Sequence, residues 1–210
     1  MPSAPAPLAR VILIGGPSGS GKSRLAEHSG LPLLRLDDFY RSGDDPLLPR
    51  LPGGEVDWDH PGSWHLDRAC AALEELARTG RTEVPNYSIS ANGPVGTRVL
   101  ELGGATRFVA EGVFVAEVAE ATRAAGILED AVCVSRSRWV TAVLRFVRDV
   151  REKRKRIPFL IRRGFLLARR EREILAHLRD AGFRPVPVRG IRRLLAGQRP
   201  GLPRPAARPE

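Results

Sequence analysis

The stretch Gly16-Pro17-Ser18-Gly19-Ser20-Gly21-Lys22-Ser23 decides how this chain is expected to fold. It fills every fixed position of the pattern G-x-x-x-x-G-K-[ST], which is typical of loops that hold phosphates. Residues 11–14 before it predict a short buried strand, and residues 23–28 after it predict the start of a helix. A glycine-rich turn in that position directs several backbone N–H groups to one point, where the positive end of the helix dipole also attracts an anion. The stretch therefore predicts a polyphosphate site formed by Gly16, Ser18, Gly19, Ser20, Gly21, Lys22, Ser23 and Arg24.

The use of lysine in this loop supports the same interpretation. The chain has 34 Lys and Arg residues together, and only three of them, Lys22, Lys153 and Lys155, are Lys. An ammonium group is compact enough to lie beside the β- and γ-phosphates of a nucleotide, whereas a guanidinium group is a wide planar fork. The alternative is a glycine turn that matches the pattern by chance. This alternative explains neither the flanking strand and helix nor the lysine at this position.

Composition limits the classes of protein to consider. A length of 210 residues fits one domain, which we expect at residues 9–190 with flexible tails at 1–8 and 198–210. No apolar run approaches the length of about 20 residues that a membrane span needs, and residues 1–10 do not resemble a secretory signal. The two cysteines, Cys70 and Cys133, lie far apart in the sequence. We therefore expect a protein of the reducing cytoplasm without a disulfide framework.

Short apolar strands alternate with helical patterns along the chain. This alternation predicts an α/β fold, in which helices cover both faces of a parallel sheet and the loops after the strands meet at one edge. The expected strands are 9–14, 33–36, 107–110, 131–134 and 184–188, and the expected helices are 22–29, 66–78, 118–125, 138–155 and 164–181. Residues 41–61 predict a long loop, and residues 79–105 predict a β-rich excursion with a turn at Asn92-Gly93.

Acidic residues follow two of the expected strands. Asp37 and Asp38 come after the second strand, and Glu111 comes after Phe108-Val109-Ala110. Magnesium prefers hard oxygen ligands, so Ser23, Asp37 and Glu111 are candidate metal ligands, and a carboxylate at this edge could also accept a proton. The alternative is that these acids are solvated groups in strand-to-loop turns.

A basic segment lies in the second half of the chain, and the formal net charge is +10. Cations on a helix at about 145–165 could close over a migrating phosphoryl group as a lid. A solvated basic face is the alternative for this segment. The charge also keeps nucleic-acid binding open.

Aromatic and acidic residues cluster in and around the long loop. Aromatic walls with a few polar groups suit a nucleobase or a similar ring, and core packing is the alternative for the same residues, which are Phe39, Tyr40, Trp58, Trp64 and Tyr87. Asp57, Asp59, His60 and His65 match no metal-binding spacing, and we favour substrate contact for them over loop structure.

Five stretches in order resemble the uridine kinase branch of the P-loop kinases, which includes phosphoribulokinase and bacterial pantothenate kinase. They are Gly16 to Ser23, Leu36-Asp37-Asp38-Phe39-Tyr40, Asp57-Trp58-Asp59-His60-Pro61, Val84-Pro85-Asn86-Tyr87 and Glu111-Gly112. The basic residues 145–152 resemble the family's entry into the lid. The resemblance covers about residues 10–160 and implies a three-layer P-loop NTPase fold, a parallel sheet with helices on both faces, and a basic helical lid.

The resemblance implies ATP and Mg²⁺ as cofactors and a role for each matching residue. Asp37 matches the catalytic base, Ser23 and Glu111 match groups associated with magnesium, and Lys22 matches the lysine at the phosphates. The candidate contacts to the acceptor are Asp59, Tyr87, Arg145, Tyr40 and Asn92. The candidate lid residues are Arg148, Lys153 and Lys155, and we expect Arg148 to act in catalysis. Where the family carries a base-reading His after the tyrosine, this chain has Ser88 to Gly93, and Asn92 is nearest to that position.

The sequence thus predicts an ATP-dependent phosphotransferase that phosphorylates a hydroxyl of a small molecule, with a nucleoside such as uridine or cytidine as the favoured acceptor. A kinase for another small molecule, similar to pantothenate kinase or phosphoribulokinase, is one alternative. A basic NTP-binding module that docks on nucleic acid is another, and a nucleotide-binding regulator without transfer is a third. We expect no membrane partner, and homo-oligomers would be consistent with the family.

Overall fold

The computed structural model describes residues 6–17, 19–135 and 172–197. Several expectations lie outside these residues, and they concern Ser18, the lid at 145–165 with Arg145, Arg148, Lys153 and Lys155, and most of the two tails. The single domain at 9–190 likewise stays a prediction.

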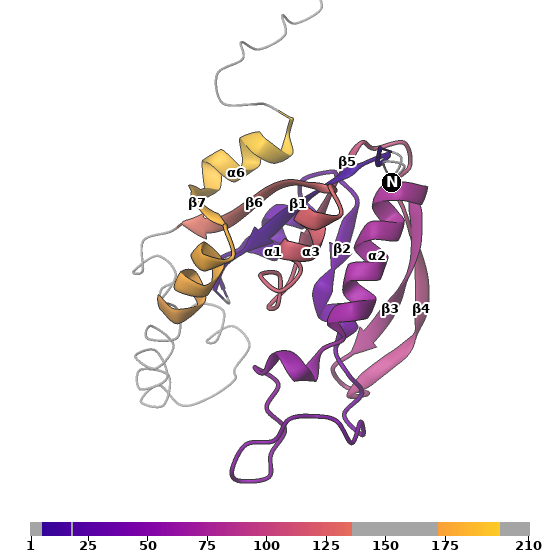
Figure 1. Ribbon diagram of the computed structural model, residues 1–210, viewed down its shortest axis with the longest axis vertical. Coiled ribbons are helices and arrows are strands. Elements are labelled where there is room, and N and C mark those ends of the chain that lie inside the picture. Colours follow the sequence, from indigo (N-terminus) through magenta and orange to yellow (C-terminus); the bar gives the residue numbers. More distant parts are fainter. Residues whose placement is uncertain (1–5, 18, 136–171, 198–210) are drawn as a thin grey trace, which may run out of the picture.

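A five-stranded parallel sheet forms the centre of the molecule (Figure 1). Its strands lie in the order β2-β5-β1-β6-β7, and each neighbouring pair is parallel. The strands are β1 (Arg10–Gly15), β2 (Leu33–Arg35), β5 (Arg107–Glu111), β6 (Leu128–Ser135) and β7 (Arg184–Pro187). All five expected strands are present, which confirms the predicted α/β class with a parallel sheet.

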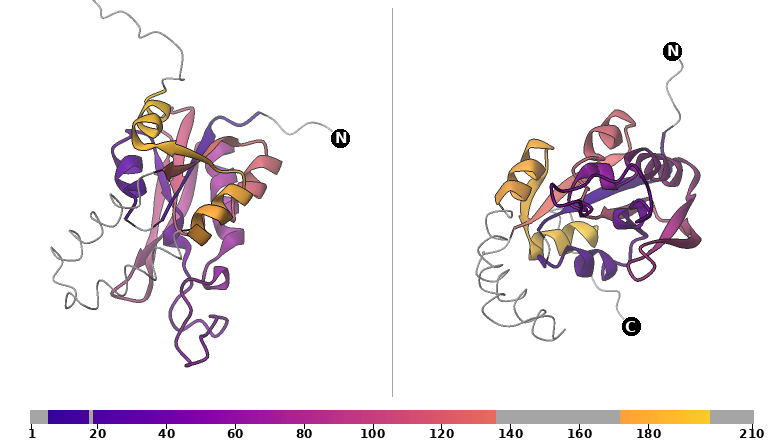
Figure 2. Two further views of the ribbon diagram at one scale, coloured as in Figure 1. Left: turned by 90° about the vertical axis from the view of Figure 1, so that its left-hand side faces the viewer. Right: turned by 90° about the horizontal axis from the view of Figure 1, so that it is seen from below.

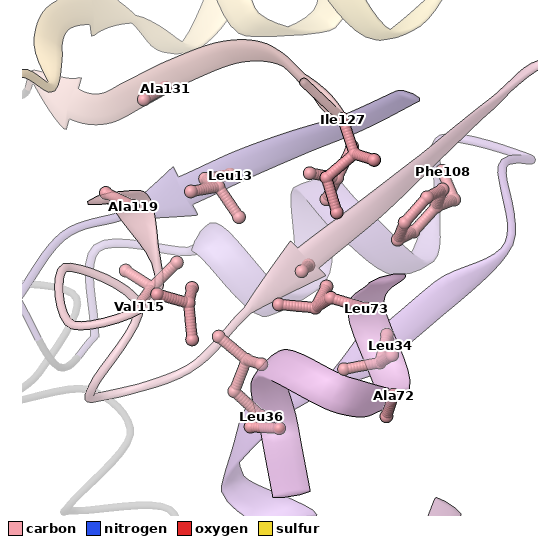
Figure 3. Packing of buried hydrophobic residues seen from close by; sticks show 14 of the residues in the cluster. Leu13, Leu34, Leu36, Ala72, Leu73, Phe108, Val115, Ala119, Ile127 and Ala131 are labelled. Carbon is pink, nitrogen blue, oxygen red and sulfur yellow. The ribbon is translucent and has the colours of Figure 1, made fainter. Parts of the chain in front are cut away.

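Helices cover both faces of this sheet, so the molecule has three layers (Figure 2). The cause is visible in β1, where Val11 and Leu13 face one side while Ile12 and Ile14 face the other. One side packs against α2 (Leu66–Thr79), α3 (Ala119–Ala124) and the helical residues 172–180. The other side packs against α1 (Lys22–Glu27) and α6 (Val188–Leu195). Figure 3 shows the core on the α2 side of the sheet, to which Leu13, Phe108 and Leu73 belong.

A separate antiparallel hairpin lies beside α2 (Figure 1). It consists of β3 (Arg81–Ser88) and β4 (Gly93–Glu101), and the predicted turn at Asn92-Gly93 joins the two strands. Asn92 takes a left-handed conformation there, with φ of 53°. The buried side chains of Val84 and Leu102 belong to the core on the α2 side, which ties the hairpin to the domain.

Two short 3₁₀ turns bound the long loop, η1 (Leu36–Phe39) directly after β2 and η2 (Pro61–Ser63) before α2. The sequence did not predict these turns, nor did it predict α6. No helix in the described parts of the chain is long and apolar enough to cross a membrane.

Candidate active site

The glycine-rich turn joins β1 to α1, as the sequence predicts. Gly16, Gly19 and Gly21 all have positive φ, at 149°, 79° and 86°. These values suit glycine, because side chains rarely tolerate this region. A Cβ atom on Gly16 would also lie 2.9 Å from Oγ of Ser20. The Gly-x-x-Gly-x-Gly spacing is therefore a requirement of this backbone path.

Ser20 has a buried hydroxyl inside this turn. The residue is 1% exposed, and its Oγ has no hydrogen-bond partner within the described residues. Gly21, the N-cap residue of α1, supplies no side-chain cap either. Buried polar groups are normally paired, so the hydroxyl of Ser20 is a candidate partner for a polar ligand at this turn.

Glu111 lies at the centre of the site. It ends β5, and its register neighbours are Ile14 on β1 and Arg35 on β2. Its Oε2 accepts a hydrogen bond of 3.0 Å from Oγ of Ser23. Burial raises the pKa of Glu111, the charge of Lys22 opposes this shift, and the charge of Asp37 adds to it. Lys22 and Asp37 therefore lie within electrostatic reach of the same carboxylate.

Asp37 is held at this edge by the segment that follows β5. Its Oδ1 accepts a hydrogen bond of 2.8 Å from the backbone N–H of Val113. A Cβ atom on Gly112 would lie 2.8 Å from that same Oδ1 and 2.7 Å from Cβ of Leu36. Glycine at position 112 thus lets Asp37 approach, and this explains the Glu111-Gly112 pair in physical terms.

The structure brings together the three predicted metal ligands, Ser23, Asp37 and Glu111. The electrostatic effects at Glu111 connect all three, and hard oxygen donors of this kind suit Mg²⁺. Within residues 6–17, 19–135 and 172–197, no group of three or more His, Cys, Asp and Glu side chains is arranged to hold a metal ion. Magnesium at nucleotide sites typically uses one or two carboxylates together with phosphate oxygens, and the residues present fit that mode.

The aromatic residues divide into a core set and a site set. Phe39 and Trp64 are each 3% exposed and belong to the core, where Nε1 of Trp64 donates to the carbonyl of Leu36 at 2.6 Å. Tyr40, Trp58 and Tyr87 are only half-buried. The ring of Tyr40 lies 5.9 Å from that of Trp58 and 6.0 Å from that of Tyr87.

Tyr40 lies close to two acidic side chains of the site. Burial raises the pKa of its hydroxyl, and the charges of Asp37 and Asp59 raise it further. Three of the residues predicted to contact an acceptor, Tyr40, Tyr87 and Asp59, thus lie around one point near Asp37. Asp57 and His60 instead serve the loop, since Oδ1 of Asp57 accepts from the N–H of Asp59 and Nδ1 of His60 accepts from the N–H of Gly62.

Asn92 and Asp38 show contacts that the sequence did not predict. The backbone oxygen of Asn92 accepts a 2.7 Å hydrogen bond from the N–H of Gly43, and its side-chain amide packs against Gly43. Asp38 pairs with Arg98 of β4, with 3.2 Å between Oδ2 and the guanidinium nitrogen. No sequence motif includes Arg98 or Gly43, so neither contact could be predicted from the sequence.

A cavity of about 710 Å³ adjoins the glycine-rich turn on the α1 and α6 side of the sheet. It begins at Gly19 and Gly21 and continues between the two helices. Its other lining residues are Arg24, Leu25, His28, Ser29, Arg192, Leu195 and Ala196. Arg24, a predicted phosphate-binding residue, is therefore an exposed wall of this cavity.

Comparisons with known proteins give the chain relatives in sequence and in fold. No protein-family model matches the chain. The uridine kinases of Saccharomyces cerevisiae and Schizosaccharomyces pombe are 34% and 32% identical to it over 115 and 112 residues, about 50% of this chain. The chain spans only 22% and 24% of the length of these two relatives.

The fold has a counterpart among solved structures. A crystal structure described as that of a proposed fructose transport system kinase from Silicibacter sp. TM1040 superposes with a TM-score of 0.55. The match covers 89% of this chain and 93% of that chain at 16% identity, so it bears on the fold alone. The fold of this chain is that of the P-loop kinases, and about half of the chain is related in sequence to the uridine kinases.

Proposed function

We propose that this protein is an ATP-dependent kinase that transfers a phosphoryl group to a hydroxyl of a small molecule, with a nucleoside as the favoured acceptor. The observation that carries the proposal is the meeting of Lys22, Asp37 and Ser23 around Glu111 at one edge of the sheet. The relation to uridine kinases over half of the chain supports it.

On the donor side, the N–H groups of the glycine-rich turn and the ammonium group of Lys22 would hold the β- and γ-phosphates. Ser20, with its unpaired hydroxyl, is a further candidate partner of a phosphate oxygen. The adjoining cavity between α1 and α6 offers room for the rest of the nucleotide. A bound Mg²⁺ would neutralise charge on the phosphates, with Ser23, Glu111 and Asp37 as the residues able to hold it directly or through water.

On the acceptor side, Asp37 is the proposed base. The acceptor oxygen would form a bond to the γ-phosphorus while the bond to the β–γ bridging oxygen breaks, so that ADP leaves, and the hydroxyl proton would pass to Asp37. The hydrogen bond from Val113 orients this carboxylate. Positioning and charge neutralisation would supply most of the rate enhancement.

Tyr40, Tyr87 and Asp59 are the proposed acceptor contacts among the described residues. A half-buried aromatic pair suits a planar ring, and a carboxylate suits the hydroxyls of a sugar. Asn92, Arg145, the lid residues Arg148, Lys153 and Lys155, a cytoplasmic location and homo-oligomer formation stay predictions from the sequence.

The acceptor can be identified with the purified protein, ATP and Mg²⁺. A panel of nucleosides, pantothenate, hexoses and sugar phosphates is scored by ADP release, with GTP as a second donor. We expect the highest kcat/KM with a pyrimidine nucleoside. A preference for a carboxylate- or phosphate-bearing acceptor would favour the pantothenate kinase-like or phosphoribulokinase-like alternative. Tight, salt-sensitive binding to RNA without transfer to any acceptor would favour the nucleic-acid module suggested by the net charge.

A further inference from the structure

The β3–β4 hairpin is attached to the segment that carries Asp37 at three points. Arg98 donates to Asp38 at 3.2 Å, and the N–H of Gly43 donates to the backbone oxygen of Asn92 at 2.7 Å. The rings of Tyr40 and Tyr87 lie 6.0 Å apart, and Tyr40 is between Asp38 and Gly43 in the sequence. The hairpin therefore runs along residues 38–43, the segment between the proposed base and the long loop.

Asp37 and Asp38 are neighbours in a single 3₁₀ turn, η1, and successive residues of such a turn point about 120° apart. Asp37 accepts from Val113 after β5, whereas Asp38 pairs with Arg98 on the hairpin. Two partners on different elements thus fix the rotation of the turn. If one of them is lost, the other carboxylate is free to move.

The environment of Asp38 makes its partner important. Its side chain is 17% exposed and that of Arg98 is 39% exposed. Removal of Arg98 would leave a half-buried carboxylate beside Asp37 without its hydrogen-bonding cation, which is costly. The turn can relieve that cost by rotating, and rotation displaces Asp37.

We propose that Asp38 and Arg98 form a positioning pair, which holds the η1 turn against the hairpin so that Asp37 faces the phosphate loop and Tyr87 stays beside Tyr40. This inference rests on the proposed function, because the pair acts on catalysis only through Asp37. Neither residue touches the reacting atoms. The pair would connect the acceptor wall to the proposed base.

The first test compares Arg98→Met with Arg81→Met in the full chain. Methionine keeps an unbranched apolar stem without the charge, and Arg81 is an exposed arginine at the start of the same hairpin. With ATP, Mg²⁺ and the best acceptor of the panel, we expect Arg98→Met to lower kcat about tenfold and to raise the KM of the acceptor, since small misplacements of catalytic groups cost one to two orders of magnitude. The KM of ATP should stay within about twofold of the wild-type value, and Arg81→Met should behave as wild type.

A double-mutant cycle shows whether the two residues act as one unit. We expect Asp38→Asn combined with Arg98→Met to lose no more activity than the worse of the two single variants. Losses that multiply, or a kcat of Arg98→Met within about twofold of wild type in a variant that melts normally, would overturn the pair. If Arg98→Met does not fold, Arg98→Lys keeps the charge and should retain most of the activity.

A readout that needs no activity separates this inference from the proposed function. The amide proton of Val113 should resonate downfield in the wild-type NMR spectrum, because it bonds to Asp37, and should shift upfield in Arg98→Met but not in Arg81→Met. A wild-type protein that phosphorylates nothing but shows these shifts would refute the kinase and keep the pair. An unchanged Val113 resonance in Arg98→Met would refute the pair whatever the activity.

Discussion

The donor side and the acceptor side of the candidate site are built in different ways. The proposed donor side comes from one contiguous stretch, residues 16–24, in which three glycines adopt conformations that other residues rarely adopt. The proposed acceptor side is assembled from segments far apart in the sequence, where Tyr40, Asp59 and Tyr87 meet through tertiary contacts. A local backbone path tolerates little change, whereas an assembled wall can be altered one contact at a time. We infer that the acceptor can vary among proteins that share this donor site.

The largest effect is expected from Lys22, the single ammonium group of the donor side. Lys22→Ala should reduce kcat/KM at least about 10³-fold, the upper range for removing one preorganised group that stabilises the transition state. Lys22→Arg should lose almost as much activity, because the wider guanidinium does not fit the space around Lys22, which is 9% exposed. Steady-state kinetics with ATP and the best acceptor provide the measurement. Near-normal turnover in Lys22→Arg would contradict the steric argument.

Asp37 tests the boundary between the two sides. Asp37→Asn should keep the affinity for an ATP analogue and lower kcat by about 10²-fold or more, the usual range for a lost general base. Isothermal titration and steady-state kinetics measure the two quantities separately. Unchanged turnover would remove Asp37 from the mechanism, and a lost ATP affinity would place it on the donor side instead.

Gly112 should have a smaller effect through Asp37. Gly112→Ala would place a Cβ atom 2.8 Å from Oδ1 of Asp37, so the carboxylate must shift, and we expect kcat to fall about tenfold with ATP affinity unchanged. Gly53→Ala is the matched control, because a Cβ atom there meets nothing within 4 Å. Equal activities of the two variants would show that the close approach at Gly112 is unimportant.

The smallest effect is expected in stability rather than in rate. Burial raises the pKa of Glu111 above its ordinary value of 4.5, so the folded state binds this proton more readily than the unfolded state. The stabilisation of the fold by protonated Glu111 is therefore lost as the pH rises through the raised pKa, and it is fully present only below pH 4.5. The free energy of unfolding of the wild type, measured relative to Glu111→Gln by urea titration, should accordingly increase as the pH falls from 7.5 towards about 5. A difference that is constant with pH would contradict the burial of this carboxyl group.

The sequence predicted the parts of the structure that depend on local pattern. The strand before Gly16, the order of the five strands and the position of Asp37 after β2 all followed from periodicity and motif spacing, whereas Glu111, which was expected just after its strand, is the last residue of β5. Helix α6 was missed because its eight residues include a glycine and three arginines, and only packing against Ile12 and Ile14 reveals its apolar side. Arg98 could not have been found, since nothing in its strand distinguishes it from other exposed arginines until the hairpin meets Asp38.

The contact between Gly15 and Leu178 has a consequence for variation at both positions. Leu178, in the helical residues 172–180, fills the space beside the last residue of β1, and a Cβ atom on Gly15 would lie 2.5 Å from its Cδ2. Leu178 is 3% exposed, and Gly15 is also buried. Homologues with alanine at position 15 should therefore carry a shorter side chain at position 178. In an alignment of such homologues, positions 15 and 178 should covary although most of the chain separates them.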